Sequence, residues 1–279
     1  MVQRIGNRLL VAAASDVGRV RTLNEDAFLV DDQIGLLVVA DGMGGHDAGE
    51  VASKLVVESI RTTLRAFPRS APGPICPIPH AAPPLPGNAG PMPQDEPTVD
   101  EAPNPILSVV QSAINRANAA VNDANVNRGY PDGMGMGSTL VGLWLPEYSE
   151  RPVVFHVGDS RSYLFSQGQL RQLTQDHSMY QQWVNYGARG QPPAQNILLQ
   201  AMGPSSFVTP DVTFQEVAPG DVALLCSDGL SGMIAHTRIA AVLNETNADN
   251  LDEACHKLID LAKKAGGRDN ITVILGCFL

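Results

Sequence analysis

The chain has 279 residues, of which 44% are hydrophobic, and a formal net charge of −10. This length accommodates one large domain or two small ones. The acidic balance, without a block of Lys and Arg, argues against binding to nucleic acid or an anionic membrane, and no run approaches the roughly 20 apolar residues of a membrane helix.

The spacing of the cysteines and histidines argues against two further classes of protein. The four cysteines lie far apart without a C-x-x-C pair, which argues against a zinc ribbon or a redox dithiol and favours reduced thiols. The six histidines show no H-x-H or H-E-x-x-H spacing, so a histidine-rich zinc hydrolase is not indicated. Residues 4–14 resemble a secretory leader, but the apolar run is short, and we expect a cytoplasmic protein.

The first part of the chain predicts strands and then helices. Short apolar or β-branched runs at residues 8–14, 27–31 and 35–40 predict an antiparallel meander of three strands. Apolar residues recur at nearly helical spacing over 48–67 and again over 106–128. We expect these two helices to pack antiparallel.

A proline-rich segment separates the two predicted helices. Residues 68–105 contain 13 of the 21 prolines in the chain. This composition predicts an extended, flexible insertion. A docking site for a proline-reading partner is the alternative.

The second part returns to strands. They are expected at 138–145, 151–157, 161–166 and 169–173, with a hairpin turn at Gln167-Gly168, and later at 208–217, 222–226 and 271–278. Helices are expected within 179–200 and at 238–243 and 251–264. This order favours an α+β fold with sheets inside and helices outside.

The run D-G-M-G-G-H at residues 41–46 follows an apolar stretch that reads as a buried strand. It places the carboxylate of Asp41 on a glycine-rich turn, where backbone carbonyls can approach a cation without obstruction by side chains. Taken alone, such a turn is as consistent with a tight connection.

Aspartates stand beside predicted strand ends at five places. Any one of them alone is typical of a turn or a helix cap. Converging carboxylates would repel one another and lose hydration, so convergence implies neutralising cations. Oxygen ligands favour Mg²⁺ or Mn²⁺ over zinc or copper. The five places are N-E-D (24–26), D-G (41–42), G-D-S-R (158–161), S-D-G (227–229) and R-D-N (268–270).

Six motifs in this order resemble the bacterial metal-dependent serine/threonine protein phosphatases of the PPM, or type 2C, family. They are R-x-x-N-E-D (21–26), D-G-M-G-G-H (41–46), G-S-T-L (137–140), G-D-S-R (158–161), S-D-G-L (227–230) and R-D-N-I-T (268–272). The resemblance spans nearly the whole chain outside the proline-rich insertion. It implies a four-layer αββα sandwich of two antiparallel sheets flanked by helices, forming one catalytic domain over residues 1–279.

The resemblance also implies the roles of the site residues. Asp41 would bridge two Mn²⁺ or Mg²⁺ ions, and Asp228 and Asp269 would complete the ligands of the first ion. The second ion would be served by Glu25, the carbonyl of Gly42 and Asp26, and a weaker third site would involve Asp159 with Asp228.

The implied reaction is direct attack on phosphorus by a hydroxide that bridges the two metals, without a covalent enzyme intermediate. Arg21 would bind the substrate phosphate through its bidentate guanidinium; pairing with a nearby carboxylate is the alternative. Met43 stands where eukaryotic relatives have the histidine proposed as the general acid, so the proton donor is open. His46 or a metal-bound water are the candidates.

The segment at about 177–203 resembles the flap beside the active site of this family, but it is shortened and carries G-Q-P-P at 190–193. Substrates are expected to be phosphoserine and phosphothreonine proteins, with a cognate bacterial kinase as partner and a monomeric enzyme. Two alternatives remain, a non-catalytic phosphoprotein-binding pseudophosphatase and an enzyme for small phosphoesters.

Overall fold

The computed structural model describes residues 2–44, 48–67 and 104–279. Its strands form two antiparallel sheets and a short ribbon. The six-stranded sheet has the order β1 (Gln3–Ile5), β2 (Leu9–Asp16), β13 (Ile271–Phe278), β12 (Val222–Cys226), β9 (Arg161–Ser166), β10 (Gln169–Gln172). The five-stranded sheet has the order β11 (Asp211–Phe214), β8 (Val153–Val157), β7 (Leu140–Trp144), β4 (Leu36–Ala40), β3 (Ala27–Asp31), and the ribbon pairs β5 (Gly42–Met43) with β6 (Gly137–Ser138).

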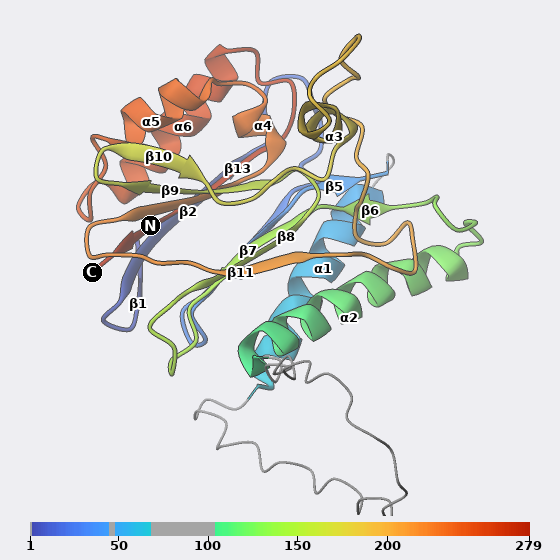
Figure 1. Ribbon diagram of the computed structural model, residues 1–279, viewed down its shortest axis with the longest axis horizontal. Coiled ribbons are helices and arrows are strands. Elements are labelled where there is room, and N and C mark those ends of the chain that lie inside the picture. Colours follow the sequence, from blue (N-terminus) through green and yellow to red (C-terminus); the bar gives the residue numbers. More distant parts are fainter. Residues whose placement is uncertain (1, 45–47, 68–103) are drawn as a thin grey trace, which may run out of the picture.

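Helices cover the outer faces of both sheets, which gives four layers (Figure 1). The five-stranded sheet carries α1 (Ala48–Arg65) and α2 (Pro105–Asn127), and the six-stranded sheet carries α5 (His236–Leu243) and α6 (Leu251–Lys264). The short helices α3 (Met179–Asn185) and α4 (Asp228–Ser231) lie at one end. The predicted α+β sandwich of two antiparallel sheets flanked by helices is confirmed.

The strand β4 shows why its sequence is apolar at every position. Leu37 and Val39 lie in the core between the two sheets, whereas Leu36, Val38 and Ala40 lie in the core beneath α1 and α2. A strand with both faces buried has no polar alternation. Burial of these runs supplies the main favourable term of folding.

The predicted three-strand meander is wrong. β2 pairs with β13 from the other end of the chain, while β3 and β4 form a hairpin in the other sheet. Short runs that are apolar on both faces have no periodicity that identifies a partner strand. Pairing was therefore expected between strands that follow one another in the sequence. The short elements β1 and α4 were also not predicted.

The other predicted elements match the structure closely. Gln167 and Gly168 both have positive φ, 51° and 78°, and join β9 to β10 as the hairpin turn requires. Of the proline-rich range, residues 68–103 lie outside the described residues. Pro105 is the first residue of α2, where a missing N–H is tolerated, and the side chain of Asn104 accepts a hydrogen bond from the backbone N–H of Ile106 at 2.9 Å.

Within the described part of the chain, no helix combines the length and apolar character needed to cross a membrane. The three described cysteines, Cys226, Cys255 and Cys277, are buried free thiols. Cys76 lies outside the described residues.

An ion-pair cluster with a buried carboxylate and two partly exposed arginines joins β3 to α1. The carboxylate of Asp31 is buried and accepts hydrogen bonds from the Nε atoms of Arg61 at 3.0 Å and Arg65 at 2.7 Å. Burial by itself raises the pKa of Asp31, but the hydrogen bonds from Arg65 and Arg61 outweigh it and lower that pKa overall.

We predict that Asp31→Asn lowers the free energy of unfolding by about 1–3 kcal/mol, because the two guanidinium groups lose their buried acceptor. Since the folded-state pKa is lowered, the stabilisation is present above the unfolded value of about 3.9 and is lost as the pH falls through the folded value. Urea unfolding at pH 7 and at pH 3 measures both effects. Asp32→Asn, at the exposed neighbouring position, is the control. If Asp31→Asn lowered the free energy of unfolding equally at pH 7 and pH 3, the lowered pKa of Asp31 would be contradicted.

Candidate functional site

Asp41 follows β4, and its backbone is held on both sides by Thr139. The N–H of Asp41 donates to Oγ1 of Thr139 at 3.0 Å, and the N–H of Thr139 donates to the carbonyl of Asp41 at 2.8 Å. Next to it, a Cβ on Gly42 would lie 2.2 Å from the carbonyl oxygen of Gly49 and 2.5 Å from that of Glu25. Only glycine permits this close approach of three backbone segments.

Negative charge converges on Asp41. Exclusion of water raises the pKa of its carboxyl well above the ordinary value, and the charges of Asp26, Asp228, Asp159 and Asp269 raise it further. The structure therefore brings together five aspartates that are far apart in the sequence, as the sequence predicted.

Asp26 is a buried member of this cluster. Its Oδ2 accepts hydrogen bonds from the hydroxyls of Ser227 at 2.8 Å and Thr272 at 2.6 Å. Its Oδ1 is buried and receives no hydrogen bond from any described residue. Burial raises the pKa of Asp26 to about 7, against the lowering effect of the two hydroxyls, with a further contribution from Asp228. A buried carboxylate oxygen without a donor is a position that a cation can satisfy.

Asp228 is the first residue of α4, directly after β12, and its carboxyl lies within hydrogen-bonding reach of Asp41. Burial and then the charge of Asp269 raise its pKa. Asp159 follows β8, and burial followed by the charges of Asp228 and Asp176 raises its pKa to about 7. The two residues implied for a third cation thus lie near each other.

Arg21 supplies positive charge at this cluster. Its Nη2 donates to Oδ2 of Asp269 at 2.8 Å, and its side chain is 48% exposed. This hydrogen bond and the charge of Asp269 raise the pKa of Arg21, with smaller contributions from Glu25 and Asp41. The pairing with a carboxylate that the sequence left as an alternative is therefore present.

Asn270 holds the loop that presents Glu25. Its Oδ1 accepts the backbone N–H of Glu25 at 2.8 Å, while its Nδ2 donates to the carbonyls of Val17 at 3.0 Å and Leu23 at 2.9 Å. The carboxylate of Glu25 lies against Gly49, where a Cβ would come within 2.6 Å of Oε1.

Sequence reasoning missed the supporting residues Thr139, Ser227, Asn270 and Thr272. Each of the four belongs to one of the quoted motifs, which was a signal in the sequence. Only the contacts show that Ser227 and Thr272 bind the Asp26 carboxylate, whereas Thr139 and Asn270 hold the backbones of Asp41 and Glu25. Met43, which stands in the place of the eukaryotic histidine, lies on β5, and His46, the side chain considered as the proton donor, lies outside the described residues.

The donor set fits hard divalent cations. It combines carboxylates, backbone carbonyls and an orphaned buried carboxylate oxygen, without a described histidine or cysteine among them. Such a cluster is electrostatically unfavourable by itself, because burial penalises each charge and neighbours repel. Divalent ions would relieve both penalties, and oxygen ligands suit Mg²⁺ and Mn²⁺.

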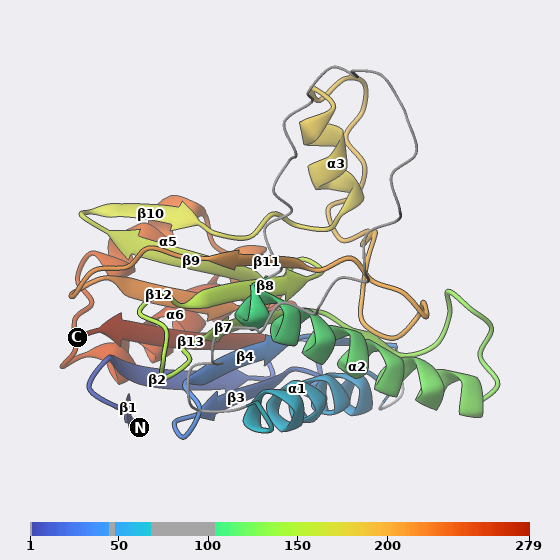
Figure 2. The ribbon, with the colours of Figure 1, turned by 60° about the horizontal axis from the view of Figure 1, so that its bottom comes forward.

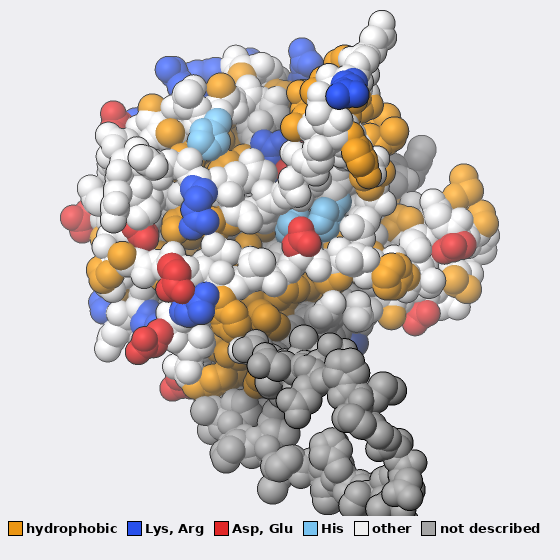
Figure 3. Space-filling view, in the orientation of Figure 1, with side chains coloured by type: hydrophobic (Ala, Val, Ile, Leu, Met, Phe, Trp, Pro, Cys, Tyr) orange, Lys and Arg blue, Asp and Glu red, His pale blue; other side chains and the backbone are white. Residues whose placement is uncertain are grey.

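The segment 177–203 projects from the body of the protein, with α3 standing away from the sheets (Figure 2). At its far end, Met202 and Ser138 exchange backbone hydrogen bonds of 2.8 and 3.0 Å, next to Thr139. Apolar side chains gather on the projecting part (Figure 3), and the exposed ones are Met179, Val184, Tyr186, Ile197 and Leu199.

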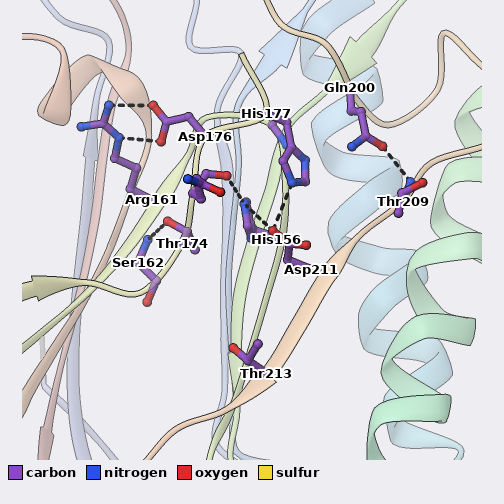
Figure 4. Close-up of polar contacts among 12 residues, drawn as sticks. His156, Arg161, Ser162, Thr174, Asp176, His177, Gln200, Thr209, Asp211 and Thr213 are labelled. Carbon is purple, nitrogen blue, oxygen red and sulfur yellow. Dashed lines mark hydrogen bonds and ion pairs between the residues drawn. The ribbon is translucent and has the colours of Figure 1, made fainter. Parts of the chain in front are cut away.

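Near the start of the segment, Arg161 forms a bidentate pair with Asp176, with Nε–Oδ1 and Nη2–Oδ2 distances of 2.9 and 2.7 Å. This pair anchors the chain before α3 to strand β9 (Figure 4). Trp183 donates from Nε1 to the carbonyl of Arg189 at 2.7 Å and packs beside Tyr180, so it serves the internal packing of the segment.

Comparisons with known proteins agree with this architecture. Residues 18–261 match the family model described as Protein phosphatase 2C. The serine/threonine protein phosphatase PstP of Mycobacterium tuberculosis is 34% identical over 273 residues, which cover 96% of this chain and 44% of that protein. This chain therefore spans less than half the length of that relative.

Two further comparisons, one with a relative and one with a solved structure, cover nearly the full length of both chains. The serine/threonine phosphatase stp of Listeria monocytogenes is 32% identical over 269 residues, covering 94% of this chain and 92% of that protein. The crystal structure of the catalytic domain of PstP in complex with two manganese ions has 32% identity and a TM-score of 0.75, covering 98% of this chain and 99% of that one. The ordered motifs, the two-sheet sandwich and the converging aspartates thus agree with the family match, and the chain belongs to the protein phosphatase 2C family.

Proposed function

We propose that this protein is a metal-dependent phosphatase that removes phosphate from phosphoserine and phosphothreonine in proteins. The observation that carries the proposal is the convergence of four carboxylates on Asp41 at the edge of the sandwich. Family membership and the retention of every expected carboxylate support turnover over the non-catalytic alternative.

Two divalent ions, Mn²⁺ or Mg²⁺, would be held with Asp41 between them. Asp228 and Asp269 would serve one ion, and Glu25, Asp26 and the Gly42 carbonyl the other, with Asp159 and Asp228 at a weaker third position. When bound, such ions supply an activated water at neutral pH and neutralise charge on the phosphoryl oxygens. A relative solved with two manganese ions supports this assignment.

The protein's own residues position the reactants. Thr139 and Gly42 fix the backbone that carries Asp41, and Ser227 and Thr272 fix the carboxylate of Asp26. Fixed charges need no reorganisation during the reaction, which is the main source of electrostatic catalysis.

Arg21 is the proposed phosphate-binding residue. Its bond to Asp269 uses Nη2, and no other hydrogen bond from its guanidinium to a described residue is present. A guanidinium has five N–H donors, so others remain for phosphate oxygens, and the half-exposed side chain is accessible to a substrate.

The proposed substrates are phosphoproteins, with a cognate kinase as the opposing enzyme. The exposed apolar side chains of segment 177–203 offer contact area for a polypeptide beside the aspartates. We propose that residues 1–279 act as one catalytic domain, with 68–105 as an insertion and 177–203 as a shortened flap.

We predict that Asp228→Asn lowers kcat/KM for a phosphothreonine peptide at least about 100-fold, because the site loses a carboxylate proposed to hold the divalent ions. Phosphate release is measured with Mn²⁺ and with excess chelator, which should abolish turnover by the unaltered protein. Asp249→Asn, at an exposed position on the surface, is the control. Turnover that survives both the chelator and Asp228→Asn would refute the metal-dependent reaction.

We predict that Arg21→Ala raises KM for the phosphopeptide about tenfold or more, because phosphate loses a charged hydrogen-bond donor. Mn²⁺ affinity is measured in parallel by calorimetry. If Arg21 only pairs with Asp269, Mn²⁺ affinity changes and KM at saturating Mn²⁺ does not. Arg238→Ala, at an exposed position on α5, is the matched control.

We predict that Mn²⁺ at 100 times its dissociation constant stabilises the folded chain by about 2.7 kcal/mol. Asp41→Asn should remove most of this gain while raising the melting temperature of the metal-free protein, since it relieves repulsion among the carboxylates. Thermal unfolding with Mn²⁺ and with chelator measures both. A lower metal-free melting temperature in the variant would contradict the repulsive arrangement.

A further inference from the structure

Two histidines and an aspartate outside the carboxylate cluster point at one another (Figure 4). His156 lies on β8, Asp211 begins β11 directly opposite it in the antiparallel ladder, and His177 precedes α3. The N–H of His177 donates to the carbonyl of Gly158 at 2.9 Å, which fixes its backbone beside the end of β8. Three separate segments therefore deliver these side chains to one place.

The three side chains place one ligand atom each close to a common point. Oδ2 of Asp211 lies 3.4 Å from Nε2 of His177 and 3.8 Å from Nε2 of His156. One ligand atom from each of the three residues can be chosen so that all lie within 4.8 Å of one another. Ligand atoms about 2.0–2.2 Å from a tetrahedral zinc ion are separated by about 3.3 Å. The carboxylate oxygen is already near this spacing from each ring, and any pair of donors needs to approach by at most about 1.5 Å.

Burial suits the two imidazoles to ligation. The side chains of His156 and His177 are 3% and 12% exposed, whereas that of Asp211 is 56% exposed. Burial lowers the pKa of His156, with a further lowering from His177 beside it, against an opposing hydrogen bond to Gln175; the neutral ring is the form that binds a metal. The exposed carboxylate leaves a path for an ion and a position for water.

The cluster also has internal hydrogen bonds with which a metal would compete. Nε2 of His156 lies 2.8 Å from the carbonyl oxygen of Gln175, and Nδ1 of His177 accepts the N–H of Gly158 at a long 3.3 Å. Ligation through Nε2 of His177 shifts its proton to Nδ1 and breaks the 3.3 Å bond from Gly158. Ligation through Nε2 of His156 also breaks its 2.8 Å bond to the Gln175 carbonyl, so the metal has to replace both hydrogen bonds. A purely hydrogen-bonded cluster without metal affinity is the alternative that the experiment separates.

We propose that His156, His177 and Asp211 bind one divalent transition-metal ion, with Zn²⁺ as the preferred occupant, at a site separate from the carboxylate centre. Two imidazoles and one carboxylate select Zn²⁺ over Mg²⁺, whereas the oxygen donors around Asp41 favour hard cations. The ion joins β8, β11 and the chain that leads into α3, so it restrains the base of segment 177–203. This inference does not depend on hydrolysis.

The experiment measures Zn²⁺ binding by equilibrium dialysis with Mg²⁺ in large excess to occupy the carboxylate centre. The unaltered protein, His177→Gln and Asp211→Asn are compared, with His256→Gln at an exposed position on α6 as the matched control. Asp211 is largely exposed, so its variant is expected to fold even if a histidine variant does not. Co²⁺ replaces Zn²⁺ in a second titration, in which its visible absorption reports nitrogen and oxygen ligation.

We expect one more Zn²⁺ ion per chain in the unaltered protein and in His256→Gln than in His177→Gln, and at least about tenfold weaker binding in Asp211→Asn. Zn²⁺ should also slow tryptic cleavage after the exposed Arg189 in the unaltered protein but not in Asp211→Asn. Equal Zn²⁺ stoichiometry and affinity in the unaltered protein and Asp211→Asn would overturn the proposal and leave a hydrogen-bonded cluster only.

Discussion

Folding brings the carboxylates around Asp41 together against their mutual repulsion, and the apolar core has to compensate for that cost. Burial and neighbouring charge raise the pKa values of Asp26, Asp41, Asp159 and Asp228, which means that folding places these groups where their ionised forms are disfavoured. The chain tolerates this cost because the sandwich buries apolar runs on both faces of each sheet. Electrostatic repulsion confined to one site, with stability supplied by the rest of the fold, is typical of a functional site.

The geometry of the site depends on long-range strand pairing. β2 pairs with β13 over its whole length, and β13 also pairs with β12. This register brings Thr272 and Ser227 together on Oδ2 of Asp26 and brings Asn270 to the loop that carries Glu25. The proposed ligand set, drawn from both ends of the chain, is therefore positioned by pairing of backbone strands, which limits the freedom of its side chains.

The two proposed metal sites differ in the chemistry of their donors. The centre at Asp41 offers oxygen atoms, whereas the cluster below α3 offers two imidazoles and a carboxylate. They are close in the chain, since Gly158, whose backbone contacts His177 twice, directly precedes Asp159. An ion at the histidine cluster thus acts on the base of the projecting segment without sharing ligands with the other centre.

Much of the site was determined by the sequence alone. The glycine-rich turn after a buried strand predicted Asp41 as a candidate site residue, and repeated strand-end aspartates predicted its neighbours, because each pattern depends only on adjacent residues. Helix positions followed in the same way from the spacing of apolar residues. The pairing of the strands became clear only from the tertiary structure. Because β2 and β4 are apolar on both faces, their residue patterns do not indicate a partner strand or a register.

The same limit applies to contacts between distant residues. The sequence left two roles open for Arg21, and only the fold places Asp269 2.8 Å from its guanidinium. The histidines showed no metal-binding spacing, yet antiparallel pairing of β8 with β11 and the path of the chain into α3 bring His156, His177 and Asp211 together. Motifs of adjacent residues can be recognised in the sequence. The meeting of distant side chains depends on how burial of apolar surface folds the whole chain.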